Sequence, residues 1–175
     1  MVETMDAITI LKDLAGRPSE VAARLKDRVS PEMLNAHPGD HDNSIAWLVW
    51  HTAREIDEQV SELSQQETVW VSQGFGDRFG LDLEPHELGF GQSGDRARSI
   101  QVQDVDLLFE HLDAVVKAEL DYIDTLSDED LGAVIDDNWD PPVTRSARLV
   151  SVSEDALQHL GQATYITGMD TSVFQ

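Results

Sequence analysis

The sequence contains no cysteine. This absence excludes disulfide bonds, thiolate metal ligands and a cysteine nucleophile, so any thiol chemistry must use a thiol supplied by a substrate. Basic residues are also scarce: 12 lysines and arginines stand against 34 aspartates and glutamates, and the formal net charge is -22. Such a charge repels phosphate backbones and anionic lipid surfaces, so we expect neither nucleic acid nor a membrane among the partners.

Long hydrophobic runs are missing as well. No stretch reaches the roughly 18 consecutive apolar residues of a membrane span, and the N-terminus has no basic segment followed by an apolar one. We therefore expect a cytoplasmic protein. The hydrophobic content of 41% and the four tryptophans favour an ordered globule, and the length of 175 residues suits a single domain over residues 1–175.

Apolar residues recur at helical spacing in four segments, near residues 4–29, 43–63, 103–126 and 152–168. We expect an interruption of the first segment at residues 16–18 (GRP), and Asn43 or Ser44 as the N-cap of the second. Residues 64–101 hold six glycines and predict a long crossover loop between the second and third helices. The pattern as a whole predicts an all-α fold, an antiparallel four-helix bundle.

Three side chains on two of these helices are candidate metal ligands. Asp155 and His159 are four residues apart, so they project from the same face of a helix. His51 falls toward the edge of the apolar stripe of the second helix, where it can face a pocket. Three protein ligands leave one tetrahedral position open, as in catalytic zinc sites. The structural alternative is that Asp155 pairs with an arginine and that His159 is a hydrogen-bonded core histidine.

Residues 43–51 (NSIAWLVWH) and 155–162 (DALQHLGQ) resemble the two signature segments of the DinB-like superfamily. More narrowly, these segments and residues 148–152 (RLVSV) resemble the actinobacterial branch related to mycothiol-dependent maleylpyruvate isomerase. The resemblance covers nearly the whole chain, including the long crossover. It implies a divalent metal, zinc or alternatively nickel, held by His51, Asp155 and His159. It also implies a metal-dependent transferase that joins a low-molecular-weight thiol such as mycothiol to an electrophilic small molecule.

Several alternatives remain open at this stage. Many members of the family have histidine where this chain has Asp155, whereas the isomerase branch has a carboxylate there. Aspartate is shorter than glutamate, so Asp155 ligates the metal either directly or through water. A metal with an open position also activates water, which makes a hydrolase the second enzymatic hypothesis. A non-catalytic metal-binding bundle with a closed metal shell is the third.

Four further residues are candidates for the wall of a substrate pocket: Arg148, Gln162, Arg54 and Trp139. Each has a structural alternative. Arg54 lies one turn from His51 toward solvent and suits a surface ion pair, Arg148 suits a pair with Asp155 or Glu154, and Gln162 suits a hydrogen bond between helices.

The crossover holds two other features that bear on function. Phe75, Phe79 and Phe90 are apolar positions that we expect to be exposed, either at the interface of a homodimer or on a lid over the pocket. Residues 89–94 (GFGQSG) match the glycine pattern of dinucleotide-binding loops, but no strand precedes them. Without that strand the pattern does not indicate dinucleotide binding.

Overall fold

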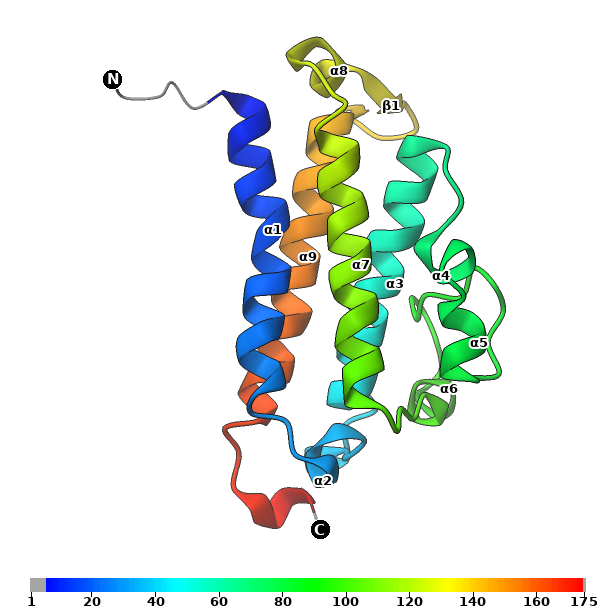
Figure 1. Ribbon diagram of the computed structural model, residues 1–175, viewed down its shortest axis with the longest axis vertical. Helices are drawn as coiled ribbons and strands as arrows, with labels where there is room; N and C mark the ends of the chain where they lie inside the picture. The colour runs from blue at the N-terminus through cyan, green and yellow to red at the C-terminus, as the bar shows by residue number, and fades with distance from the viewer. Residues whose placement is uncertain (1–5, 175) are drawn as a thin grey trace.

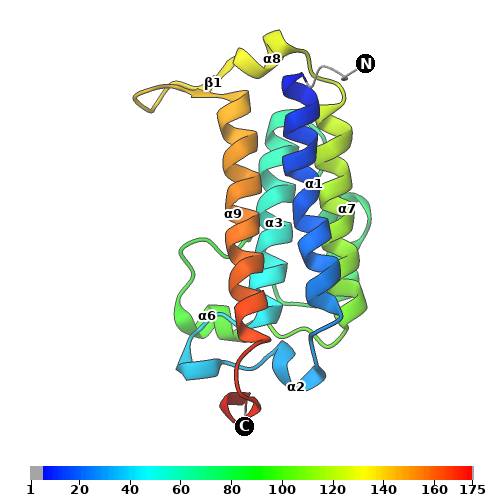
Figure 2. The ribbon, with the colours of Figure 1, turned by 90° about the vertical axis from the view of Figure 1, so that its left-hand side faces the viewer.

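The computed structural model describes residues 6–174, and nearly all of its regular structure is helical (Figure 1). This confirms the predicted all-α class. The longest helices are α1 (Ala7–Lys26), α3 (Ile45–Ser64), α7 (Val105–Ile123) and α9 (Arg145–Ile166). They lie side by side in both views (Figures 1 and 2), and α1 and α3 each pack against both α7 and α9.

The connections between the long helices determine their directions. The crossover after α3 returns the chain to the end at which α3 began, so α3 and α7 run in the same direction (Figure 1). Helix α9 runs opposite to α3, and α1 runs opposite to α7. The predicted antiparallel packing therefore holds for the pairs α3/α9 and α1/α7, whereas α3/α7 and α1/α9 are parallel. The α3/α9 pair is the one that positions the candidate site.

The ends of the long helices are capped by side chains. Ser44 accepts a hydrogen bond of 3.1 Å from the backbone N–H of Trp47, which confirms it as the N-cap of α3. Thr144 caps α9 in the same way, so this helix begins at Arg145 rather than near residue 152 as predicted. The first turns of α9 are polar, so the spacing of apolar residues did not indicate where this helix begins.

Helix α1 continues without the interruption expected at residues 16–18. A proline inside a helix removes one backbone hydrogen bond and costs about 3 kcal/mol. Pro18 is buried, and α1 packs along much of its length against α7 and α9. That packing outweighs the local cost.

The predicted crossover loop contains three short helices: α4 (Val69–Ser72), α5 (Phe75–Phe79) and α6 (Gly94–Ser99). Helices α4 and α5 pack against α7, and α4 also contacts α3. Phe75 is therefore buried and Phe79 packs against the core, which corrects the prediction that both are exposed. Phe90, in contrast, is 90% exposed.

The remaining elements lie at the two ends of the bundle (Figures 1 and 2). They are α2 (Pro31–Leu34), η1 (Pro38–Asp40), α8 (Asp128–Gly132), β1 (Val134–Asp136), β2 (Val143–Thr144) and η2 (Thr171–Phe174). Strands β1 and β2 form a small antiparallel pair that the sequence pattern did not predict. None of the described helices is both long enough and apolar enough to cross a membrane.

The interior between the long helices is apolar, with residues such as Trp50, Leu112 and Leu160 fully buried. Helices α3 and α7 also bury ionisable side chains: α3 buries His51, Arg54 and Asp57, and α7 buries His111 and Glu119. Buried polar groups are costly unless they are paired or bind a ligand. The partners of these residues therefore indicate where the chemistry of the protein lies.

Candidate metal centre

The contact between α3 and α9 brings together His51, Glu55, Asp155 and His159, whose ligand atoms lie within 4.8 Å of one another. Each helix contributes a histidine and a carboxylate one turn apart, so that both members of a pair share a face. Two imidazoles and two carboxylates form a donor set that suits zinc and similar divalent ions. These four residues, which we call the metal cluster, could hold a divalent metal.

His51 is held in the orientation of a metal ligand. Its Nδ1 donates a hydrogen bond to the backbone carbonyl of Leu88, so its Nε2 carries the free lone pair. That Nε2 faces the cluster, 3.5 Å from the carboxylate of Glu55. The ring of Trp47 stacks on the imidazole with centroids 4.6 Å apart. Burial lowers the pKa of His51, which keeps the imidazole neutral and able to bind a cation.

A segment of the crossover, residues 85–92, covers His51, and we call it the strap. Gly89 in the strap has a φ of +101°, and a Cβ added there would lie 2.9 Å from Nδ1 of His51 and 3.0 Å from the ring of Trp47. Gln92 accepts a hydrogen bond of 3.0 Å from Nε1 of Trp47. Only glycine fits this conformation and this close approach, so Gly89 allows the strap to lie against His51 and Trp47.

The pKa values of the two carboxyl groups in the metal cluster are shifted in opposite directions. Burial, together with the neighbouring Asp155, raises the pKa of Glu55 to about 8. Burial alone would raise the pKa of Asp155 too, but the neighbouring His159 and Glu55 outweigh it and hold this pKa at about 2. The carboxylate of Asp155 in turn raises the pKa of His159. A metal-free cluster thus shares protons among its members, and a bound cation would replace them.

The hydrogen bonding and charge of the cluster also fit a divalent metal. Oδ2 of Asp155 is buried and makes no well-formed hydrogen bond, although Nδ1 of His159 lies 2.9 Å away. Among the described residues, the two carboxylates have ion-pair contacts with His51 and His159 and none with lysine or arginine. A buried, under-used carboxylate oxygen beside two imidazoles is the environment that a divalent cation stabilises.

Glu55 was missed by the sequence analysis. Its signal was present, because His51 and Glu55 are four residues apart, as are Asp155 and His159. The two pairs run in opposite order along the chain, which is what two antiparallel helices need to bring like positions together. The prediction was based on the apolar stripe of α3, which indicated His51 as a candidate ligand but not Glu55.

Arg54 does not line a pocket, and it is not a surface ion pair either. Its side chain is fully buried. The guanidinium donates to the carbonyls of Pro85 and Glu87 at 2.6 and 3.1 Å and to the carboxylate of Glu58 at 2.7 Å. The expected ion pair exists, with Glu58, but it is buried rather than at the surface, because the crossover, more than thirty residues along the chain, covers Arg54.

The other predicted pocket residues occupy different places. Arg148 lies 3.7 Å from Glu62 and 3.9 Å from Asp136, rather than beside Asp155 or Glu154, and it lines a cavity near the start of α9. Trp139 is 65% exposed, and its indole donates to Asp136. Gln162 lines a cavity next to the metal cluster. Of these candidates, Gln162 is the one that the fold places beside the cluster.

Comparison with known proteins agrees with this architecture. The family model of the DinB superfamily matches residues 16–163. A solved structure, described as the crystal structure of the conserved protein of locus from Enterococcus faecalis, is 35% identical in sequence, with a TM-score of 0.85 over 94% of this chain and 96% of that chain. No curated protein matches this chain. Since the family model spans most of the sequence and includes both helices of the metal cluster, this chain belongs to the DinB superfamily.

Proposed function

We propose that the protein is a metal-dependent transferase that joins a low-molecular-weight thiol to an electrophilic small molecule. The observation that carries the proposal is the metal cluster, in which two histidines and two carboxylates converge from α3 and α9. The resemblance of residues 43–51 and 155–162 to the mycothiol-dependent branch supports a thiol as co-substrate. The chain has no cysteine, so the reacting sulfur comes from that co-substrate.

His51, Asp155 and His159 would hold the metal, zinc or nickel. A metal ion bound there would lower the pKa of a thiol at its open position and favour the thiolate. The protein's own contribution is to orient and desolvate: Leu88 fixes His51, and Trp47 covers one face of its ring. In the reaction, the sulfur forms a bond to the electrophilic carbon. The leaving group departs with the bonding electron pair, and the thiol proton passes to solvent.

Glu55 gives a second candidate function some support. Structural zinc sites use four protein ligands and have no open position, and Glu55 is a fourth potential ligand. A cluster closed in this way would bind metal without turnover. Against this, Gln59 donates a hydrogen bond of 3.0 Å to Glu55 and holds one of its carboxylate oxygens. We therefore propose that Glu55 stays beside the metal and leaves the open position to the thiol.

The first test is metal content, measured by plasma mass spectrometry on untagged wild-type protein and on His159→Ala and Glu55→Gln variants. We expect about one equivalent of zinc or nickel in the wild type and in Glu55→Gln, and its loss in His159→Ala. Loss in Glu55→Gln would instead identify Glu55 as the fourth ligand of a closed centre. Metal-free wild type that does not take up added zinc would overturn the proposal.

The second test measures turnover of 1-chloro-2,4-dinitrobenzene with and without N-acetylcysteine. Turnover that requires the thiol supports the transferase. Release of chloride without thiol would indicate a hydrolase, and bound metal without any turnover would favour the non-catalytic centre.

A further inference from the structure

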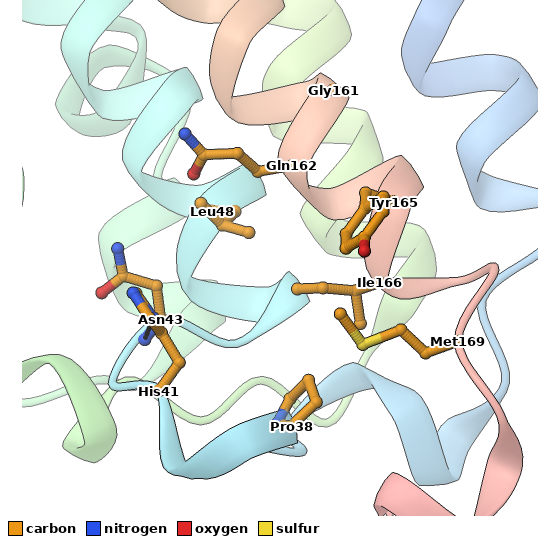
Figure 3. A pocket seen from close by; sticks show the side chains of 9 residues that line it. All are labelled: Pro38, His41, Asn43, Leu48, Gly161, Gln162, Tyr165, Ile166 and Met169. Atoms are coloured by element: carbon orange, nitrogen blue, oxygen red, sulfur yellow. Dashed lines mark hydrogen bonds between the residues drawn. The ribbon is translucent and has the colours of Figure 1, made fainter.

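The contact between α3 and α9 continues past the metal cluster into a cavity of about 490 Å³ (Figure 3). Leu48 in its wall lies three residues before His51, and Gln162 lies three residues after His159. Because α3 and α9 run in opposite directions, both residues are displaced from the cluster toward the same end of the bundle, by about one helical turn. We call this space the seam cavity, and its wall begins about one helical turn from the metal cluster.

The walls of the seam cavity are mostly apolar. Leu48, Ile166 and Met169 project into it from α3, α9 and the turn after α9, and Pro38 closes its lower end (Figure 3). Polar groups come from uncharged amides such as those of Asn43 and Gln162, and from the imidazole of His41. Of the described residues that line the cavity, none is Asp, Glu, Lys or Arg, in a chain whose formal net charge is -22.

This lining selects the charge of a ligand. A charged group moved from water into an apolar cavity is costly unless an opposite charge or several hydrogen bonds compensate it. The seam cavity has no arginine or lysine for a carboxylate and no carboxylate for an amine. Its two amides can hold a carbonyl, hydroxyl or nitro group. A volume of about 490 Å³ lies in the usual range for small-molecule sites.

The other end of the same helix pair has the opposite character. A cavity of about 550 Å³ there is lined by Arg145, Arg148, Glu62 and Asp136, among others. A charged ligand would find partners at that end. The contrast makes the seam cavity the place for a neutral molecule.

We propose that the seam cavity binds the electrophile of the reaction, and that this electrophile is a neutral, largely apolar small molecule with one or two hydrogen-bonding groups. The assignment rests on the proposed transferase function, because it places the reacting carbon next to the metal cluster. It excludes dicarboxylates and other anions as the preferred electrophile of this chain.

Gly161 offers a sharp test of the assignment. It lines the cavity from α9, and no heavy atom lies within 4 Å of a Cβ added there. The Cβ of a Gly161→Leu variant therefore meets no other atom, its side chain takes up space at the wall of the cavity, and it replaces a residue that disfavours helix. Gly16→Leu on α1 is the matched control, because Gly16 is also helical, has equally open surroundings and lies outside the cavity.

Binding is measured first, by nuclear magnetic resonance titration with benzyl alcohol and with benzoate, two probes that share a ring and differ in charge. We expect benzyl alcohol to shift the backbone amides of Gly161 and Gln162 in the wild type and in Gly16→Leu, and benzoate to shift them at least about tenfold less at equal concentration. These shifts should be lost in Gly161→Leu. Equal shifts with benzoate, or shifts confined to other residues, would overturn the assignment.

Turnover is measured next, with N-acetylcysteine and two aryl chlorides, neutral 1-chloro-2,4-dinitrobenzene and anionic 4-chloro-3,5-dinitrobenzoate. We expect kcat/KM to be at least about tenfold higher for the neutral chloride, and Gly161→Leu to raise its KM about tenfold with unchanged metal content. If kcat/KM is unchanged in Gly161→Leu, or is higher for the anionic chloride, the assignment of the seam cavity is wrong, and the proposal of a transferase still holds. A metal-loaded protein that reacts with neither chloride would overturn the transferase itself. Benzyl alcohol shifts would then support only a neutral-ligand cavity.

Discussion

Helix α3 contributes to two clusters of ionisable side chains. They contain similar residue types but differ in burial and in the partners of their carboxylates. The metal cluster faces α9 and contains two histidines and two carboxylates. The second, which we call the sealed cluster, faces the crossover and α7 and consists of Arg54, Asp57 and His111. Both include histidine and aspartate within 4 Å of each other.

The sealed cluster satisfies its charges internally. Asp57 accepts hydrogen bonds of 2.7 and 2.8 Å from the backbone N–H groups of Val69 and Trp70, and it lies 3.4 Å from the guanidinium of Arg54. His111 is fully buried, and burial lowers its pKa, so it stays neutral. Every member is at most 3% exposed. The sealed cluster therefore anchors the crossover to α3.

Among the described residues, the carboxylates of the metal cluster have ion-pair contacts with His51 and His159 and none with arginine or lysine. The cluster is also less completely buried, with the side chain of Asp155 34% exposed. The two clusters thus differ in whether a fixed positive charge is paired with the carboxylates. Where arginine is present, the carboxylates are already paired. Where it is absent, they remain available to a cation from solvent.

The largest expected difference between the clusters is in metal content. Replacing His159 by alanine removes a ligand, so we expect the loss of at least about nine-tenths of the bound metal. Replacing His111 by phenylalanine keeps an aromatic ring among Trp70, Phe75 and Phe79 and should leave the metal content unchanged. Plasma mass spectrometry of both variants checks this, and loss of metal from the His111→Phe variant would break the comparison.

The two aspartates should differ in their effect on stability. In Asp57→Asn, Arg54 keeps its pair with Glu58, but the amide can accept only one of the two backbone hydrogen bonds from Val69 and Trp70. We therefore expect the free energy of unfolding to fall by about 1–3 kcal/mol. In Asp155→Asn, the charge that His159 and Glu55 stabilise is lost, but Glu55 also loses a like charge beside it. Because these effects oppose each other, the metal-free protein should lose less than about 1 kcal/mol. Urea unfolding of both metal-free variants measures the difference. Equal losses would show that the metal cluster is structural as well.

A third buried carboxyl group, Glu119 on α7, has neither an arginine partner nor a hydrogen bond among the described residues. Burial raises its pKa to about 8 from the ordinary value of 4.5. Because the folded pKa is raised, the contribution of protonated Glu119 to stability is complete below pH 4.5 and is lost as the pH rises through 8.

We therefore expect Glu119→Leu to be more stable than the wild type at pH 8.5, by roughly 2–3 kcal/mol, and to show a smaller decline in stability between pH 6 and 8.5. Urea unfolding of the metal-free proteins at the two pH values measures both quantities. Parallel pH profiles for the two proteins would show that Glu119 has a partner that neutralises it.

The smallest expected effect concerns the strap. A Cβ at residue 89 would displace His51, so we expect Gly89→Ala to weaken metal binding about 10- to 100-fold, as changes to groups that orient a ligand do. Gly91→Ala is the matched control. Gly91 also has a positive φ, +70°, but no atom lies within 4 Å of an added Cβ. Zinc titrations that give equal affinities for the two variants would show that the strap does not position His51.

The sequence predicted much of this fold because helical periodicity and caps are local. Ser44 and the apolar stripe of α3 located that helix within about one residue. The i, i+4 spacing pointed to Asp155 and His159, and the edge of the apolar stripe of α3 pointed to His51; the structure brings the three residues together.

Long-range contacts explain what the sequence did not predict. Arginine is usually a surface residue. Arg54 is buried because the crossover packs over it and accepts its hydrogen bonds at the carbonyls of Pro85 and Glu87. The start of α9 was missed because its first turns are polar, although Thr144 was a local signal. The absence of charged residues from the seam cavity depends on elements from both ends of the chain, Pro38 and Met169 among them.

The strap links the two clusters in one further respect. Its carbonyls at Pro85 and Glu87 bind Arg54, and its carbonyl at Leu88 binds His51. A local unfolding event that exposes the strap must break contacts to both clusters together, so its free energy includes a contribution from each. A metal bound to His51 would raise that opening free energy and slow amide hydrogen exchange in residues 85–92. The occupancy of the metal cluster would then be measurable in a segment that supplies no ligand.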